Sequence, residues 1–292
     1  MRILITGSRG QLGSELINIA PKKHEVFGFD MDMDITDIKA VEDKFSLVEP
    51  DIVIHCAAYT DVDGCEDNAE KAYLVNCLGT ENLALVASRY KCEFVYISTD
   101  YVFDGKKTSP YTEYDEPNPL SVYGKSKLGG ERVVSQIIEK FYIIRTTGIY
   151  SKYGKNFVET IIKNSKDSKT KGVLKVVDDQ ICTPTYSKDL AECIYSLIET
   201  KMYGIYHATN NGQCSWYEFA KEIFNILINL SKVSAAPVNI EPIKSKDLVD
   251  RKAKRPSYSV LSNFKLEKRN IFYMREWKDA LKDFLEEFKD FI

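Results

Sequence analysis

A tyrosine and a lysine four residues apart, Tyr123 and Lys127, have the residue types and the spacing that suit acid–base chemistry. On a helix, residues at positions i and i+4 are neighbours on one face, so the phenol and the ammonium can point into the same space. A free phenol loses its proton only near pH ~10, and a neighbouring cation favours the phenolate and lowers that pKa. Because the same spacing occurs in many non-catalytic helices, the surrounding elements must decide its meaning.

The first twenty residues have the pattern of a strand, a glycine-rich turn and a helix. The apolar run of residues 3–5 is followed by Gly7, Gly10 and Gly13, and then by apolar residues at helical spacing. Glycines at these positions allow a tight turn and let the backbone approach a pyrophosphate, while the helix N-terminus offers unpaired N–H groups. The segment therefore predicts a dinucleotide site, against the alternative of a simple glycine turn.

Two charged residues favour different dinucleotides. Asp30 ends the second apolar strand, where its carboxylate suits a ribose diol and favours NADH, whereas Arg9 in the glycine loop suits a 2′-phosphate and favours NADPH. The segment that begins at Asp34 has the pattern of a turn beneath the adenine, although a helix N-cap explains it almost as well. Ala57 and Ala58 end a third apolar strand, and small residues there suit a backbone that lies against the cofactor.

The fourth apolar strand, 94–97, runs into Thr99 and Asp100, which places hydroxyl and carboxylate groups at a strand's carboxyl end, where a substrate should lie. Repeated alternation of strands and helices over about 150 residues favours an α/β fold with a doubly wound parallel (Rossmann) sheet. We expect residues 1–147 and 173–206 to form this domain, 148–172 and 207–261 to form a smaller mixed α/β substrate lobe, and 262–292 to form a C-terminal helical segment.

Composition and charge favour a small-molecule ligand. The chain has 292 residues, a net charge of −3, seven scattered cysteines and three histidines in strand-like runs. These features give no reason to expect nucleic acid, a membrane, a disulfide framework or a metal site, so we expect a cytoplasmic protein. The helical stripe that begins at Trp216 reads as a packing helix.

Several motifs along the chain resemble the dTDP-4-dehydrorhamnose reductase family of the extended short-chain dehydrogenase/reductase superfamily. These motifs are Thr6-Gly-x-x-Gly-x-x-Gly13, Asp34-Ile-Thr-Asp37, Cys56-Ala-Ala-Tyr-Thr-Asp-Val-Asp63, Ser98-Thr-Asp-Tyr-Val-Phe-Asp-Gly105, Tyr123-Gly-Lys-Ser-Lys-Leu128, Asp179-Gln180 with Pro184-Thr185, Ser215-Trp-Tyr-Glu-Phe-Ala220 and Arg255-Pro256. The resemblance covers nearly the whole chain, and several of its motifs are specific.

The resemblance implies that Tyr123 protonates the C4 oxygen of a 4-keto-6-deoxy nucleotide sugar, that Lys127 holds the nicotinamide ribose, and that Thr99 orients the carbonyl. NADPH or NADH would bind at Gly7, Arg9, Gly10, Gln11, Leu12, Gly13, Asp30, Asp34, Ile35, Ala57, Ala58, Tyr59, Tyr123 and Lys127. The substrate would meet Thr99, Asp100, Val102, Phe103, Gly148, Asn156 and Arg255. The basic run around Arg255 reads equally well as a diphosphate clamp and as a solvated loop.

Two local features refine this expectation. Related dehydratases place an Asp-Glu pair after the threonine, but here Thr99 and Asp100 are followed by Tyr101, which disfavours elimination and leaves reduction or epimerisation. The family's usual pocket tryptophan is replaced by Gly148, which opens space. Either the sugar carries a different substituent or epimeric configuration, or a nearby tyrosine such as Tyr153 fills the space.

The sequence leaves three properties open: a regulatory role, the oligomeric state and a metal site. Relatives of the family also serve as nucleotide-binding regulatory subunits. A homodimer is compatible with the sequence. Glu15 matches a family position near a dimer-interface metal site, but one carboxylate does not make a Mg2+ site.

Overall fold

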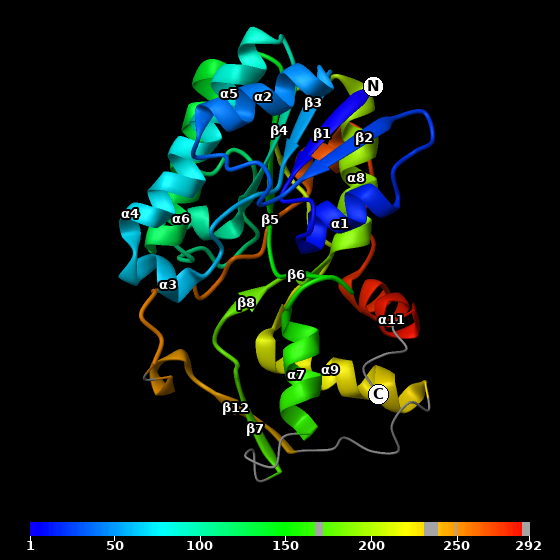
Figure 1. The fold of residues 1–292 in the computed structure, drawn as a ribbon. Helices are drawn as coiled ribbons and strands as arrows, with labels where there is room; N and C mark the ends of the chain where they lie inside the picture. The colour runs from blue at the N-terminus through cyan, green and yellow to red at the C-terminus, as the bar shows by residue number, and fades with distance from the viewer. Residues whose placement is uncertain (167–171, 231–238, 249, 288–292) are drawn as a thin grey trace.

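A six-stranded sheet forms the centre of the larger of two lobes (Figure 1). The computed structural model describes residues 1–166, 172–230, 239–248 and 250–287. All strand pairs in the sheet are parallel, in the order β10, β5, β4, β3, β1, β2. The strands are β1 Arg2–Thr6, β2 Glu25–Phe29, β3 Ile52–His55, β4 Glu93–Thr99, β5 Phe141–Thr146 and β10 Gly204–His207. The order reverses beside β1, as in a doubly wound fold, so the predicted fold class is confirmed.

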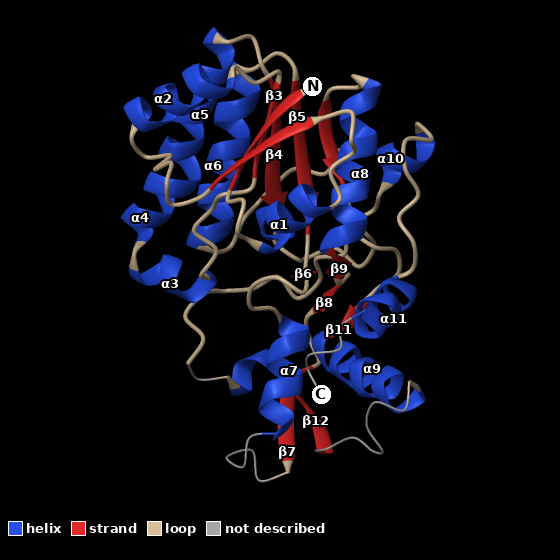
Figure 2. Ribbon diagram, turned by 45° about the vertical axis from the view of Figure 1, so that its right-hand side comes forward, coloured by secondary structure: helices blue, strands red, loops and turns tan. Residues whose placement is uncertain are grey.

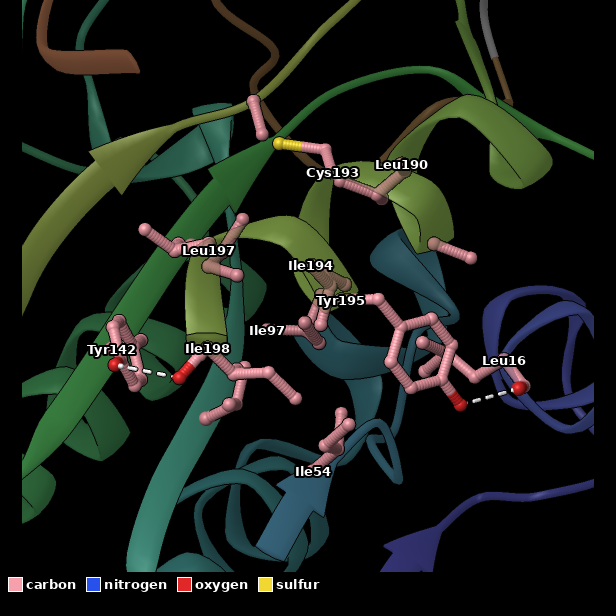
Figure 3. Packing of buried hydrophobic residues seen from close by; sticks show 14 of the residues in the cluster. Leu16, Ile54, Ile97, Tyr142, Leu190, Cys193, Ile194, Tyr195, Leu197 and Ile198 are labelled. Carbon is pink, nitrogen blue, oxygen red and sulfur yellow. Dashed lines mark hydrogen bonds between the residues drawn. The ribbon is translucent and has the colours of Figure 1, made fainter. Parts of the chain in front are cut away.

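Helices cover both faces of this sheet (Figure 1). One face packs against α1 (Gln11–Asn18) and α8 (Ser187–Thr200), and the other against α2 (Ile38–Val48), α5 (Gly79–Arg89) and α6 (Val122–Ile137). Figure 3 shows apolar residues of α8 packed against the sheet, and the Tyr195 hydroxyl donates a hydrogen bond of 2.6 Å to the Leu16 carbonyl oxygen of α1. Burial on both faces explains why the strands read as continuous apolar runs.

The helical segment between β3 and β4 is divided into short pieces. It consists of α4 (Ala69–Tyr73), a π-helical turn (Leu74–Leu78) and α5, and α3 (Val62–Asp67) precedes it. Asn76 lies in the π-helical turn, where its amide accepts a hydrogen bond from Tyr59 N–H (2.8 Å) and donates to the Tyr59 carbonyl (3.1 Å) and the Ser126 hydroxyl (3.0 Å). Asn76 therefore has a structural role: it fixes the loop after β3 against α6.

The smaller lobe lies below the carboxyl edge of the sheet (Figure 2). It contains β7 (Val173–Val177) paired in parallel with β12 (Asn239–Ile243), together with α7 (Phe157–Lys166), α9 (Trp216–Asn229) and α11 (Trp277–Glu287). Short elements complete the chain: β6 Ile149–Tyr150, β8 Ile181–Cys182, β9 Thr185–Tyr186, β11 Cys214–Ser215, α10 Phe264–Lys268, and 3-10 turns η2 Asp100–Val102 and η4 Ser245–Asp247.

The arrangement departs from the expected division of the chain at two places. The segment 173–206 is split, because β7 pairs with β12 in the smaller lobe while α8 and β10 pack in the larger lobe. The C-terminal segment is not a separate unit, since α11 packs with α9 in the core of the smaller lobe. An apolar strand pattern specifies burial but not a partner, so residues 173–177 had been expected in the larger domain.

Two of the three histidines and five of the seven cysteines are buried. His55 and His207 are buried, and desolvation lowers the pKa of each, to about 3 for His207. All seven cysteines are free thiols. No helix in the described part of the chain is long and apolar enough to cross a membrane.

Candidate active site

Helix α6 carries the tyrosine and the lysine. Its first residue follows Ser121, whose hydroxyl caps the helix by accepting a hydrogen bond of 3.1 Å from Gly124 N–H. A side chain at Gly124 would come within 2.2 Å of the Tyr101 carbonyl oxygen, so glycine allows the first turn of α6 to lie tightly against η2. Tyr123 and Lys127 then line the same cavity, which confirms the placement expected from their spacing.

Thr99 and Asp100 lie at the carboxyl end of β4, beside this turn. The Thr99 hydroxyl donates a hydrogen bond of 3.1 Å to Asp100 Oδ1 and accepts one of 3.2 Å from Tyr101 N–H. Asp100 is 3% exposed, and burial raises the pKa of its carboxyl to about 6, although the hydroxyls of Ser259 and Thr147 act in the opposite direction. Asp100 Oδ2 has no hydrogen bond within the described residues.

Burial dominates the protonation of the central pair. Desolvation raises the pKa of Tyr123, and the Thr99 hydroxyl opposes this shift. Desolvation also lowers the pKa of Lys127 to about 7, and its ammonium nitrogen lies 4.2 Å from the centroid of the Tyr96 ring. The sequence had suggested that Lys127 lowers the pKa of Tyr123, but the larger effect has the opposite sign. The phenol is therefore protonated at neutral pH, as a proton donor must be.

A buried ion pair anchors the helix one turn beyond Lys127. Glu131 accepts hydrogen bonds from Arg145 of β5 at 2.9 Å and 2.7 Å, and from the hydroxyl of Ser98 of β4. Both charged side chains are almost fully buried, at 3% and 4% exposure. The carboxylate of Glu131 also opposes the lowering of the Lys127 pKa. The pair thus fixes α6 to the two strands beneath it.

A cavity of about 1020 Å³ runs from the glycine loop to Tyr123. Gly7 has a positive φ of 62°, and a Cβ there would lie 2.7 Å from the Ala57 backbone nitrogen, so only glycine lets the loop lie against the end of β3. Of the residues expected at the cofactor, those that line this cavity are Gly7, Gly10, Gln11, Leu12, Gly13, Asp30, Asp34, Ile35, Ala57, Ala58, Tyr123 and Lys127.

The other two expected cofactor residues, Arg9 and Tyr59, do not line the cavity. The Arg9 side chain is exposed, and its backbone N–H donates a hydrogen bond of 3.0 Å to Asp30 Oδ2. Tyr59 is held through its backbone by Asn76. Both residues thus help to shape the loops that form the cavity wall.

A second cavity of about 450 Å³ adjoins the first and extends into the smaller lobe. Thr99, Asp100, Tyr123, Gly148 and Trp216 are among the residues that line both cavities. The remaining lining includes Tyr101, Gln180, Ile181, Cys182, Pro256 and Ser259. The catalytic candidates therefore lie where a cofactor cleft meets a pocket with space for a substrate.

The expected substrate residues divide into two groups. Thr99, Asp100 and Gly148 line the second cavity, and Asn156 lines the first cavity while its side chain also caps α7. The others are occupied elsewhere: Val102 and Phe103 are fully buried in the core, and Arg255 forms a two-point ion pair with Asp63 of α3, at 2.7 Å and 3.2 Å. The η2 turn explains the first pair, because it brings Asp100 and Tyr101 to the cavity and leaves Val102 and Phe103 in the core.

The sequence did not predict that Tyr101, Phe157 and Trp216 line the pocket. Trp216 and Phe157 line both cavities, whereas Tyr153, which had been suggested as a filler of the space at Gly148, lines neither. Most of the α9 stripe packs in the core as expected, but Trp216 is its first residue and lies half-buried at the cavity. Its position directly after a capping serine was the available signal, because the first turn of a helix often lies at the edge of a core.

The described residues contain no group of three or more histidine, cysteine or acidic side chains that could hold a metal ion. Glu15 is buried and accepts a hydrogen bond of 3.2 Å from the Ser151 hydroxyl, and burial raises the pKa of its carboxyl.

Comparison with known proteins places this geometry in a family. The family model described as the RmlD substrate binding domain matches residues 1–290. Over 288 residues the chain is 42% identical to the spore coat polysaccharide biosynthesis protein SpsK of Bacillus subtilis (strain 168), covering 98% of this chain and 97% of that protein. It is 38% identical over 291 residues to the dTDP-4-dehydrorhamnose reductase of Aggregatibacter actinomycetemcomitans, covering 97% of each.

Solved structures agree with these matches. A dTDP-4-dehydrorhamnose reductase from Clostridium acetobutylicum superposes with a TM-score of 0.91 at 45% identity, over 98% of this chain and 99% of that one. The Bacillus anthracis dTDP-4-dehydrorhamnose reductase, solved in complex with NADP, gives a TM-score of 0.91 at 38% identity over the same shares. The resemblance read from the motifs is confirmed, and the chain belongs to the RmlD substrate binding domain family.

Proposed function

We propose that the protein reduces the C4 ketone of a nucleotide-linked 4-keto-6-deoxy sugar, converting dTDP-4-dehydrorhamnose to dTDP-rhamnose with NADPH or NADH. The observation that carries this proposal is the meeting of Thr99 and Tyr123, which line both cavities, with Lys127, which lines the dinucleotide cleft beside them. The names of the relatives support the same reaction.

The chemistry divides between the cofactor and the chain. A bound nicotinamide supplies the hydride that adds to C4 of the sugar. Tyr123 gives its phenolic proton to the C4 oxygen as negative charge develops there, so that a C–H and an O–H bond replace the carbonyl π bond. The raised pKa of Tyr123 keeps that proton in place until the oxygen becomes basic.

The other two residues position and stabilise. The hydroxyl of Thr99 orients the carbonyl beside the phenol, which reduces the freedom lost in reaching the transition state. The charged form of Lys127 stabilises the phenolate left after proton transfer, and it holds the nicotinamide ribose. Because burial lowers the lysine pKa to about 7, we expect this electrostatic assistance to weaken as pH rises through neutrality.

The test is turnover of a 4-keto-6-deoxy nucleotide sugar by the purified protein, followed by loss of nicotinamide absorbance with NADPH and with NADH in parallel. The expected product is the 4-hydroxy sugar nucleotide, identified by its mass and proton spectrum. Absence of turnover with any keto-sugar, combined with intact cofactor binding, would instead favour a regulatory nucleotide-binding subunit.

We also propose that the protein acts in the cytoplasm and as a homodimer. Light scattering of the purified protein gives its mass in solution, and fractionation of its host cell gives its location. A monomeric mass or a membrane-bound fraction would contradict the respective statement.

A further inference from the structure

We propose that Trp216 and Phe157 form an aromatic wall that packs against the apolar side of the sugar and makes the enzyme selective for a methyl over a hydroxymethyl substituent there. This inference rests on the proposed function and deepens it, because it assigns a specificity determinant to the same pocket. Both side chains line the cofactor cleft and the second cavity, where these two spaces meet beside Tyr123.

Gly148 gives the wall access to the cavity. Its φ of 56° lies in the left-handed region, which strongly favours glycine. A Cβ at this position would lie 3.5 Å from Cη2 of Trp216 and 3.3 Å from the Cα of Pro184. Any larger side chain at Gly148 would therefore cover the indole edge, and its absence leaves Trp216 as the aromatic surface at this point of the pocket.

The position of Trp216 is held by its helix and by a stack of rings. Ser215 and Glu218 form a capping box at the start of α9, and the Ser215 hydroxyl also donates a hydrogen bond of 2.7 Å to Asp178. The ring centroid of Phe157 lies 4.6 Å from that of the Trp216 indole. Phe157 also stacks on Phe219, with 5.5 Å between the ring centroids and 14° between the ring planes. Phe219 is fully buried in the core of the smaller lobe, so the wall is preorganised.

The pocket has polar groups on one part of its lining and aromatic rings on another. Thr99, Asp100 and Tyr123 supply hydroxyl and carboxyl groups, and Asp100 Oδ2 has no hydrogen bond within the described residues. A sugar hydroxyl satisfies such groups, whereas the phenyl ring and the carbon atoms of the indole offer no conventional hydrogen-bond partner. A hydroxymethyl group against the wall would lose its hydrogen bonds to water without replacement. Apolar surfaces reject an added hydroxyl only modestly, so the expected selectivity is about 10- to 100-fold.

The kinetic test compares two substrates that differ only at C6, a 4-keto-6-deoxy nucleotide sugar and its 6-hydroxy counterpart. In Trp216→Leu we expect KM for the deoxy sugar to rise about tenfold and the preference in kcat/KM to narrow by a similar factor. Trp216→Phe should keep most of the preference. The matched control is Tyr217→Leu, on the same turn of α9 but outside both cavities, which should leave the preference unchanged.

A spectroscopic test does not depend on turnover. The chain has two tryptophans, and Trp277 is 5% exposed in the core of the smaller lobe, so Trp277→Phe leaves Trp216 as the single tryptophan, which can be excited selectively over the tyrosines. With oxidised cofactor bound, we expect dTDP-rhamnose to shift Trp216 emission and dTDP alone to bind without that shift. If Trp277→Phe does not fold, the difference between wild-type and Trp216→Phe spectra gives the same signal.

The outcomes separate this inference from the proposed function. An unchanged preference in Trp216→Leu, or equal emission shifts with dTDP and dTDP-rhamnose, would overturn the aromatic wall while leaving the reductase intact. Wild-type protein that reduces no keto-sugar would overturn the function, even where the emission shift shows that a sugar lies against Trp216.

Discussion

Lys127 combines a charge with nearly complete burial. Its side chain is 2% exposed, its ammonium lies over the Tyr96 ring, and burial lowers its pKa from 10.5 to about 7. A lowered pKa means that the folded chain binds the proton less tightly than the unfolded chain does. The buried ammonium of Lys127 therefore lowers the free energy of unfolding. The whole loss is present below pH ~7, and it disappears as pH rises toward the ordinary lysine pKa.

We expect Lys127→Met to be inactive but more stable than the wild type. The gain at neutral pH should be on the order of a few kcal/mol, because each pKa unit corresponds to about 1.4 kcal/mol. Urea denaturation at several pH values between neutrality and about pH 10 measures it. The gain should shrink as pH rises, and a variant that is less stable at neutral pH would refute the account of a buried, destabilising cation.

At the scale of elements, the ion pair between Glu131 and Arg145 joins α6 to β5. We expect Arg145→Met to lower the free energy of unfolding by about 3–5 kcal/mol, because it leaves Glu131 charged, buried and unpaired. The double variant Glu131→Leu with Arg145→Met should recover much of this loss. Equal destabilisation in the single and double variants, measured by urea denaturation, would mean that packing rather than charge pairing holds the helix.

The elements also show what the sequence could and could not predict. The glycine loop, the ends of β3 and β4 and the Tyr123 helix were predictable because strand, turn and helix signals are local and their chemistry follows from the carboxyl edge of a parallel sheet. The pairing of β7 with β12 and the position of Trp216 at the cavity were not, because both depend on which surfaces meet in three dimensions. The ion pair between Arg255 and Asp63 was not predictable for the same reason, because it joins residues 192 positions apart in the chain.

At the scale of the whole molecule, the candidate active site depends on both lobes. The cofactor cavity is lined by the glycine loop and by residues 154–157 and Trp216 of the smaller lobe, and Gln11 of α1 donates a hydrogen bond of 3.2 Å to the Lys155 carbonyl. A ligand in this cavity should therefore stabilise the two lobes together.

Both tryptophans lie in the smaller lobe, so fluorescence reports on it, whereas circular dichroism reports on all helices. We expect both signals to change at one temperature. NADP+ at about 100 times its Kd should raise that temperature, because it adds about 2.7 kcal/mol to the free energy of unfolding. Two separate transitions, only one of them moved by NADP+, would contradict a site shared between the lobes.

The central claim is that Tyr123 delivers the proton in a ketone reduction, and Tyr123→Phe tests it most directly. The substitution removes one hydroxyl and keeps the ring. We expect kcat for a 4-keto-6-deoxy nucleotide sugar to fall by about 10²- to 10⁴-fold, while the Kd for the cofactor, measured by calorimetry, stays close to that of the wild type. Turnover by Tyr123→Phe at a rate equal to that of the wild type would contradict the mechanism.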